Sequence, residues 1–276
     1  MMRIRKVSIG WYILLLAFVV VTLFPIYWML VTSLKSFQEV YTVVPTFWPK
    51  KLEWGNYLQI FSKYDYGPAL LNSIEVSAVV AVLSVTVSLF SAYSVVRLRF
   101  PGRKAMPQIF LLSYLIPQTI LFIPIYIFLS NIHLTNVIGG LFFIYPTMTI
   151  PYATWVFITH FQNFPVELEE AAFVDGATRL QTIIRVIVPP SLPTIVSTLI
   201  FSFTICWSEY IYALVVISNK GQRTITLALS NMLVADIIPW GPLMAGAVIA
   251  AVPIMAIYMV ASKYIVGGLT LGSVKG

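Results

Sequence analysis

Six long apolar stretches dominate this sequence and restrict the folds that are open to it. Each holds about 20 mostly apolar residues, the length that an α-helix needs to cross roughly 30 Å of hydrocarbon. The stretches cover residues 11–33, 70–96, 106–129, 139–160, 193–217 and 242–266. Charged residues make up only 10% of the 276 residues, against about 25% in a typical soluble domain. We therefore predict an all-α membrane protein, with one transmembrane domain of six spanning helices over residues 1–276.

Prolines interrupt the third and fourth stretches, and one lies within the sixth. A proline inside a helix frees a backbone carbonyl and kinks the helix. A membrane span tolerates this where neighbouring helices or water satisfy the freed group. The prolines are Pro107, Pro117, Pro124, Pro146, Pro151 and Pro253. We therefore expect kinks in these spans.

The first stretch, with its basic flank, could instead be a secretory signal peptide. Its apolar run is too long for that, and it ends in Phe24, Pro25, Tyr27 and Trp28 without a small-residue cleavage pattern. We expect it to remain as a spanning helix.

The distribution of lysine and arginine predicts the orientation in the membrane. With a cytoplasmic N-terminus, the cytoplasmic segments hold Arg3, Arg5, Lys6, Arg97, Arg99, Arg103, Lys104, Arg179, Arg185, Lys263 and Lys275. The outer segments then hold only Lys35, Lys50, Lys51, Lys63, Lys220 and Arg223. Short cytoplasmic loops carry the excess of positive residues, so both termini are expected in the cytoplasm. Residues 161–192 then form a cytoplasmic loop, and residues 34–69 and 218–241 form outer loops.

The predicted cytoplasmic loop contains a polar string, EEAAFVDGATRL, at Glu169–Leu180. Its acids suit the N-terminus of a short helix, and Gly176 suits the left-handed residue that ends one. Thr178 can cap a second, amphipathic helix, which Pro189 and Pro190 are expected to stop. Ala171 and Ala172 leave a small, flat face on the first helix, where another backbone could approach closely. The residues alone leave two interpretations open, a docking helix or an ordinary loop whose acids are solvated.

The same string resembles the cytoplasmic EAA signature of permease subunits in binding-protein-dependent ABC importers. The matching residues are Glu170, Ala171, Ala172 and Gly176, followed by VIVP at Val186–Pro189. Val186 and Val188 replace the usual Ile and Leu of the signature. The lead-in FPVELEEAAFVDGA is also similar to that of the family.

Other strings resemble the maltose-type sugar permeases within this class. They are LLNSIEVS, SAYSVVRLRFPGR, CWSEYIYAL and the terminal GLTLGSVKG, so the resemblance covers nearly the whole chain. In CWSEYIYAL, Ser208 replaces the Asn that is usual in the family, so we do not assign the role of that Asn to Ser208.

The resemblance implies a type I ABC importer permease fold and a set of partners. These are a second homologous permease, two copies of a cytoplasmic ABC ATPase and an extracytoplasmic solute-binding protein. It places the ATPase contact at Glu170, Ala171, Ala172, Asp175, Gly176 and Pro189, with a further contact of the tail at Gly272 and Lys275. It also implies a sugar as the solute, and an outer loop 218–241 that reaches into the binding protein. The chain itself lacks the G-x-x-x-x-G-K-[ST] phosphate loop, so it is expected to be a non-catalytic subunit.

Polar and aromatic residues in the fifth stretch are candidates for a solute pathway. Trp207, Glu209, Tyr210 and Tyr212 lie together in the sequence, and sugar sites combine aromatic faces with a few hydrogen-bonding groups. A charge within an apolar span needs a partner or an aqueous path. Structural packing is an equally open interpretation for each of the four residues.

Other function classes fit the residues less well. Two histidines, one cysteine and no paired acids inside the spans argue against a membrane-embedded enzyme, and the single cysteine excludes an internal disulfide. No metal site and no cofactor are expected. The net charge of +7 is explained by membrane topology rather than by nucleic acid. The alternative is a self-contained, ion-driven secondary transporter, but the sequence shows no convincing internal repeat and no paired midplane charges. The expected location is the inner (cytoplasmic) membrane, in contact with lipid.

Overall fold

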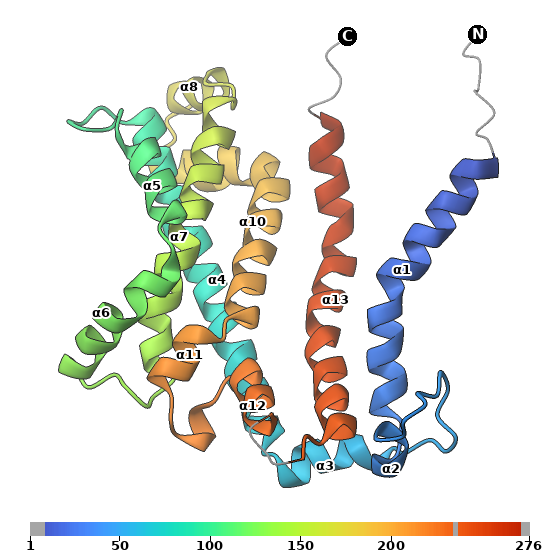
Figure 1. Cartoon of the computed structure of the whole chain (residues 1–276). Coiled ribbons are helices and arrows are strands. Elements are labelled where there is room, and N and C mark those ends of the chain that lie inside the picture. Colours follow the sequence, from blue (N-terminus) through green and yellow to red (C-terminus); the bar gives the residue numbers. More distant parts are fainter. Residues whose placement is uncertain (1–8, 234–236, 272–276) are drawn as a thin grey trace. The chain divides into compact units, whose positions relative to one another are not determined.

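The computed structural model describes residues 9–233 and 237–271, with side chains described as far as residue 262. Within these residues every regular element is helical. The long helices are α1 (Ile9–Ser33), α4 (Tyr66–Arg97), α7 (Gly139–Gln162), α10 (Val188–Ser208) and α13 (Trp240–Leu271). The shorter helices are α2 (Phe37–Val40), α3 (Gly55–Lys63), α5 (Met106–Leu115), α6 (Gln118–Asn131), α8 (Glu167–Val174), α9 (Arg179–Thr182), η1 (Ile183–Ile187), α11 (Ile211–Val216), η2 (Lys220–Gln222) and α12 (Ile225–Met232). Figure 1 shows them in chain order.

Five helical segments of the described chain are long and apolar enough to cross a membrane, and the pair α5–α6 makes a sixth if it counts as one span. The five are Ile9–Ser33, Tyr66–Arg97, Gly139–Gln162, Arg179–Ser208 and Trp240–Ser262. This confirms the prediction of an all-α membrane protein with six spanning elements.

The chain divides into two compact units. The first unit comprises the described parts of residues 1–66 and 229–252, and the second comprises those of 67–228 and 253–276. Each unit is described by itself.

In the second unit, small residues allow α4 to pack closely against α7. Ser84 and Ser88 are fully buried on α4. The Ser84 and Thr149 hydroxyls hydrogen-bond at 2.6 Å, and the Ser88 hydroxyl donates to the Ile150 carbonyl at 3.2 Å. Small side chains let helices approach closely in membranes. α7 also contacts α5, α10 and α11, so it lies at the centre of this unit (Figure 1).

The third predicted span is bent far more sharply than a proline kink. α5 and α6 meet at 93°. Ile116 and Pro117 between them are extended, with ψ of 125° and 119°. The ring of Pro117 disfavours the helical conformation for the residue before it, which explains why α5 ends at Leu115.

The fifth predicted span is also interrupted, and it begins earlier than expected. α10 ends at Ser208, Glu209 is extended with ψ of 135°, and α11 starts at Ile211. At the other end, Pro189 and Pro190 do not stop the surface helix, which corrects the prediction. They occupy the first turn of α10, where the missing N–H groups are tolerated. The π-helical turn η1 directly precedes the two prolines, and in it the Val188 N–H donates to the Ile183 carbonyl.

In the first unit, the segment after α1 folds back onto the end of that helix. The Asn56 amide donates to the Ser33 and Lys35 carbonyls, both at 2.9 Å. The Ser33 and Tyr57 hydroxyls hydrogen-bond at 2.8 Å. The Lys35 ammonium lies 4.6 Å from the centre of the Trp28 ring. Residues 34–65 of the predicted outer loop are therefore an ordered structure with helices of its own.

Candidate functional site

The helix α8 carries the polar string that the sequence singled out. Three glutamates lie in its first turn, where negative charge favours the helix N-terminus. It ends through Gly176, whose φ is +83°. The Gly176 N–H donates to the Phe173 carbonyl at 3.1 Å, and the Ala177 N–H donates to the Ala172 carbonyl at 2.9 Å. These bonds satisfy free carbonyls of the last turn, and the predicted left-handed glycine is confirmed.

The second helix of the loop begins where the sequence predicts. The Thr178 hydroxyl accepts from the Gln181 N–H at 3.4 Å, and the Gln181 side chain accepts from the Thr178 N–H at 2.8 Å. This reciprocal pair is a capping box. α8, the Gly176 turn and α9 therefore form a defined unit, which we call the EAA knob (residues 167–182).

Most of the predicted contact residues of the loop are exposed to solvent. Glu170, Ala171, Asp175, Gly176 and Pro189 are exposed, whereas the Ala172 side chain is buried. Large apolar side chains accompany them on the surface: Leu168, Phe173 and Val174 are 47%, 41% and 88% exposed. Exposed apolar side chains beside polar ones are a feature of protein–protein contact surfaces.

A buried ion pair, which the sequence analysis missed, fixes the EAA knob to α4. Arg97 Nε lies 2.7 Å from Glu169 Oε1, and the side chains are 14% and 5% exposed. The same guanidinium donates to the Phe164 carbonyl at 3.0 Å. Glu169 is thus not one of the solvated acids of an ordinary loop. The sequence signal for this pair was weak: RLRFPGR is basic and EEAA is acidic, but the sequence does not show that the two strings lie close together in the fold.

His160 makes a second link, at the end of α7. Its Nε2 lies 2.8 Å from the Ser191 hydroxyl and its Nδ1 lies 3.2 Å from the Thr194 hydroxyl, both on α10. Both ring nitrogens are therefore engaged, and the two helices that flank the EAA knob are joined directly.

The candidate pathway residues surround the break between α10 and α11. The Glu209 carboxylate accepts from the Tyr145 hydroxyl at 2.9 Å and from the N–H groups of Tyr212 and Ala213 at 2.7 and 3.1 Å. Its backbone carbonyl accepts from the Thr226 hydroxyl at 2.6 Å. The carboxylate therefore satisfies the free N–H groups at the start of α11.

The break at Glu209 is tied to the bend between α5 and α6. The Tyr212 hydroxyl donates to the Gln118 carbonyl, at the start of α6, at 2.9 Å. Trp207 is 3% exposed and stacks on Phe203 with ring centres 5.5 Å apart, while Tyr210 is partly exposed. The structure thus brings Glu209 and Tyr212 into direct contact and buries Trp207 nearby. Gly272 and Lys275, the predicted tail contacts, lie outside the described residues.

Comparison with known proteins identifies relatives of this chain. Residues 84–270 match the family described as "Binding-protein-dependent transport system inner membrane component". The inner membrane ABC transporter permease protein YcjP of Escherichia coli (strain K12) is 31% identical over 270 residues, which cover 97% of this chain and 96% of that protein. The trehalose/maltose transport system permease protein MalG of Thermococcus litoralis is 32% identical over 93% of both chains. The trehalose transport system permease protein SugB of Mycobacterium tuberculosis is 32% identical over 92% of this chain and 93% of that protein.

A solved structure shares the fold. It is a chain of a bacterial ABC transporter involved in the import of the acidic polysaccharide alginate, with a TM-score of 0.81 at 19% identity. The likeness covers 93% of this chain and 95% of that chain. The family match spans more than half of the sequence, and the helices, the EAA knob and the relatives agree with it. The chain therefore belongs to the binding-protein-dependent transport system inner membrane components, as a permease subunit of the inner membrane.

Proposed function

We propose that this permease subunit imports a carbohydrate in an ATP-driven complex, with the EAA knob contacting a separate ATPase. The sugar assignment rests on relatives named for trehalose and maltose transport. The alginate transporter has also been solved with an oligosaccharide-bound periplasmic protein, which supports delivery by a binding protein here. The proposed complex holds a second homologous permease and two ATPase subunits. Membership of a binding-protein-dependent family argues against a self-contained ion-driven carrier.

The observation that supports the ATPase contact is that the EAA knob is exposed to solvent on one face and anchored to α4 on the other. Its exposed face presents Glu170, Ala171 and Val174 to a partner. Its inner face is held by the ion pair between Arg97 and Glu169. A helix anchored in this way passes a displacement to α4 rather than absorbing it. ATP-driven movement of the partner would therefore reach the spanning helices through the EAA knob.

The proposed orientation follows from the charge distribution. Both termini and residues 161–192 lie in the cytoplasm, and residues 34–69 and 218–241 lie outside, as the lysine and arginine positions indicate. The six spans are proposed at 11–33, 70–96, 106–129, 139–160, 193–217 and 242–266. The tail residues Gly272 and Lys275 are proposed to touch the ATPase.

The proposed solute pathway runs beside the break between α10 and α11. Transporters place their binding sites at interrupted helices, where backbone polar groups are available. Trp207, Glu209, Tyr210 and Tyr212 lie at this interruption. In this role Glu209 and Tyr212 shape the break, and Tyr210, which is partly exposed, contacts the solute.

Reconstitution tests the proposed function. The complete importer in proteoliposomes, with ATP inside and a sugar-loaded binding protein outside, is expected to accumulate labelled trehalose or maltose. Omission of either ATP or the binding protein is expected to stop uptake. If this chain alone catalysed sugar uptake without ATP, the proposal would be wrong.

A further inference from the structure

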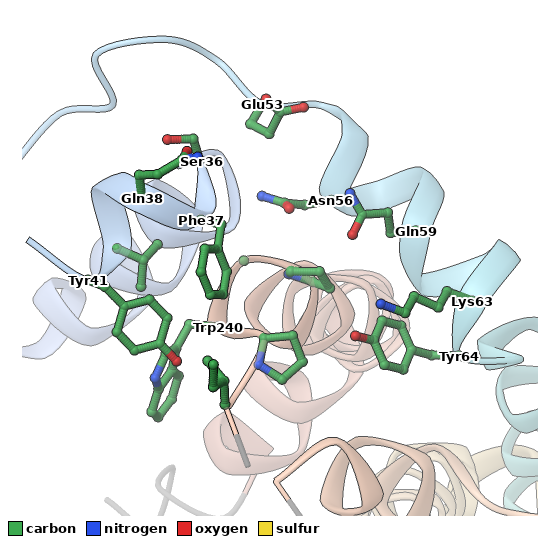
Figure 2. A pocket seen from close by; sticks show the side chains of 15 residues that line it. Ser36, Phe37, Gln38, Tyr41, Glu53, Asn56, Gln59, Lys63, Tyr64 and Trp240 are labelled. Atoms are coloured by element: carbon green, nitrogen blue, oxygen red, sulfur yellow. The ribbon is translucent and has the colours of Figure 1, made fainter. Parts of the chain in front are cut away.

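The first unit contains a cleft of about 670 Å³, separate from the EAA knob and the helix breaks (Figure 2). Its walls come from α2, α3 and the segment 237–242. Its volume falls within the range of roughly 300–1,000 Å³ that is common for small-molecule sites.

The walls of this cleft are held in place by hydrogen bonds and close packing. The Tyr41 hydroxyl donates to the Ile238 carbonyl at 2.6 Å. The buried Asn56 amide is fixed by the Ser33 and Lys35 carbonyls. A Cβ on Gly241 would lie 2.6 Å from Asn56 Nδ2, so only glycine lets that segment approach so closely. The cleft is therefore formed before any ligand arrives.

The lining combines two kinds of side chain. Aromatic rings are supplied by Phe37, Tyr41, Tyr64 and Trp240, and Figure 2 shows them around the cleft. Phe37 and Tyr41 are 55% and 47% exposed, so apolar surface is open to water there. The polar side chains without a ring are Ser36, Gln38, Glu53, Asn56, Gln59 and Lys63. Ring faces cover the C–H surfaces of a sugar, while amides and a carboxylate bond its hydroxyls.

The charges of the lining favour a neutral ligand. Glu53 is its single carboxylate and Lys63 its single ammonium. A polyanion such as an acidic polysaccharide needs more positive than negative side chains around it, whereas the lining holds one of each. A neutral saccharide needs only hydrogen-bonding groups of both kinds beside an apolar surface.

We propose that this cleft is a binding site for a neutral saccharide, a first contact for the sugar on the outer side of the permease. The inference rests on the proposed function for the identity of the solute class and for the outward placement of residues 34–69. It assigns a sugar contact to the first unit, in addition to the pathway proposed at Tyr210 in the second.

Cysteine protection tests the site directly. The chain has one cysteine, Cys206, which is buried, so a Gln59→Cys change adds one accessible thiol. The complete importer in nanodiscs is treated with a maleimide, and labelling of this chain is followed by mass spectrometry. Maltose, trehalose or diacetylchitobiose is added without the binding protein. At a sugar concentration of about ten times Kd, labelling is expected to slow roughly tenfold.

The matched control is Ser62→Cys, on the same helix but outside the lining; its labelling is expected to be unaffected by sugar. Protection that appears only when the binding protein is added would overturn the inference, since the cleft would then be a protein-docking surface. Absence of protection by all three sugars would also overturn it. Uptake of the same sugars by the same preparation then shows whether the proposed function survives by itself.

A second variant tests the aromatic wall. Phe37→Ala removes a ring that is 55% exposed and lies 5.0 Å from the Tyr41 ring, centre to centre, and it is expected to raise the half-protecting sugar concentration about tenfold. Trp48→Ala is the control, because Trp48 is 70% exposed in the same segment and does not line the cleft. Equal half-protecting concentrations in the two variants would contradict a sugar stacked at Phe37.

Discussion

At the scale of single residues, Gly176 sets the conformation of the EAA knob through its backbone alone. Its φ is +83°, and no atom lies within 4 Å of the position that a Cβ would take. A larger side chain is therefore opposed by the left-handed backbone and not by a clash. This conformation costs a non-glycine residue roughly 1–2 kcal/mol, least for Asn and most for a β-branched residue.

We expect Gly176→Val to abolish most sugar uptake while the protein still reaches the membrane, because the turn between α8 and α9 is displaced. Gly176→Asn is expected to keep most of the activity. Uptake is measured per amount of membrane-inserted protein. Gly102→Val is the control, since Gly102 has the same φ of +83° outside the EAA knob. Uptake by Gly176→Val equal to that of the Asn variant would refute the importance of this turn.

Glu39 is a largely buried carboxylate in α2, the short helix that follows α1. Its carboxylate accepts from the Thr46 hydroxyl at 2.6 Å and from the Lys50 N–H at 3.0 and 3.2 Å. Burial alone would raise the pKa of Glu39, but these hydrogen bonds and the charges of Lys35 and Lys50 outweigh it, so the pKa lies below 4.5. Burial lowers the pKa of Lys35, and the charge of Glu39 opposes that shift.

Because the folded pKa of Glu39 is depressed, its contribution to stability is present above about pH 4.5 and is lost as pH falls through the folded value. The protection factor of residues 34–54 against hydrogen exchange, which corrects for the slower intrinsic exchange at low pH, is therefore expected to fall below pH 4.5 in the wild type. Glu39→Gln is expected to exchange faster at neutral pH and to lose most of that acid response. A variant with the same pH profile as the wild type would show that Glu39 is not the titrating group.

At the scale of elements, the ion pair between α4 and α8 is the contact through which, in the proposed mechanism, a movement of the EAA knob reaches α4. Arg97 ends α4 and Glu169 lies in the first turn of α8, and both side chains are largely buried. Removing one partner leaves a buried charge alone, which costs about 3–5 kcal/mol, whereas removing both leaves none.

A double-mutant cycle is expected to show this coupling. Arg97→Ala and Glu169→Ala should each lower the melting temperature of the complex, and the double variant should lose less than the sum of the two. Uptake should fall in all three, since each frees α8 from α4. Exposed Glu167→Ala, on the same helix, is the control for helix stability. Strict additivity would mean that the pair carries no coupling.

Variants at the break between α10 and α11 distinguish a structural role, which we assign to Glu209, from contact with the solute, which we assign to Tyr210. Glu209→Ala leaves the Tyr212 and Ala213 N–H groups without their acceptor, so about 1–3 kcal/mol per unsatisfied group is expected to be lost. Glu209→Gln keeps one oxygen and should recover part of that stability. Tyr210→Phe is expected to raise the KM for sugar uptake. A normal KM in the Tyr210 variant would remove Tyr210 from the proposed pathway.

Sequence patterns predicted the elements better than the links between them. Hydropathy placed the spans, Gly176 and Thr178 placed the ends of α8 and α9, and motif resemblance led to the family. The Arg97–Glu169 pair and the hydrogen bond between Tyr145 and Glu209 were missed because they join residues 72 and 64 positions apart, which periodicity cannot relate. The effect of Pro189–Pro190 was predicted wrongly because the π-helical turn that precedes them has no signature in the sequence.

At the scale of the whole molecule, the described chain is a permease with five spanning helices and the bent pair α5–α6, and the solvent-exposed EAA knob belongs to its second unit. The family is described as binding-protein-dependent. In the proposed mechanism, energy enters through a contact of the EAA knob with a separate ATPase. The EAA knob is the described surface that combines family motif, exposure and a buried anchor on a spanning helix.

Site-specific photo-crosslinking tests that contact most directly. Ala171→Cys, in a chain whose own cysteine is buried, is labelled with a benzophenone maleimide in the complete importer and then illuminated. The expected product is a covalent adduct with the ATPase subunit, with loss of ATP-driven uptake in the crosslinked fraction. Leu58→Cys, 72% exposed on α3, is expected to give no ATPase adduct. An Ala171 adduct with lipid or the second permease alone, together with full uptake, would contradict the account.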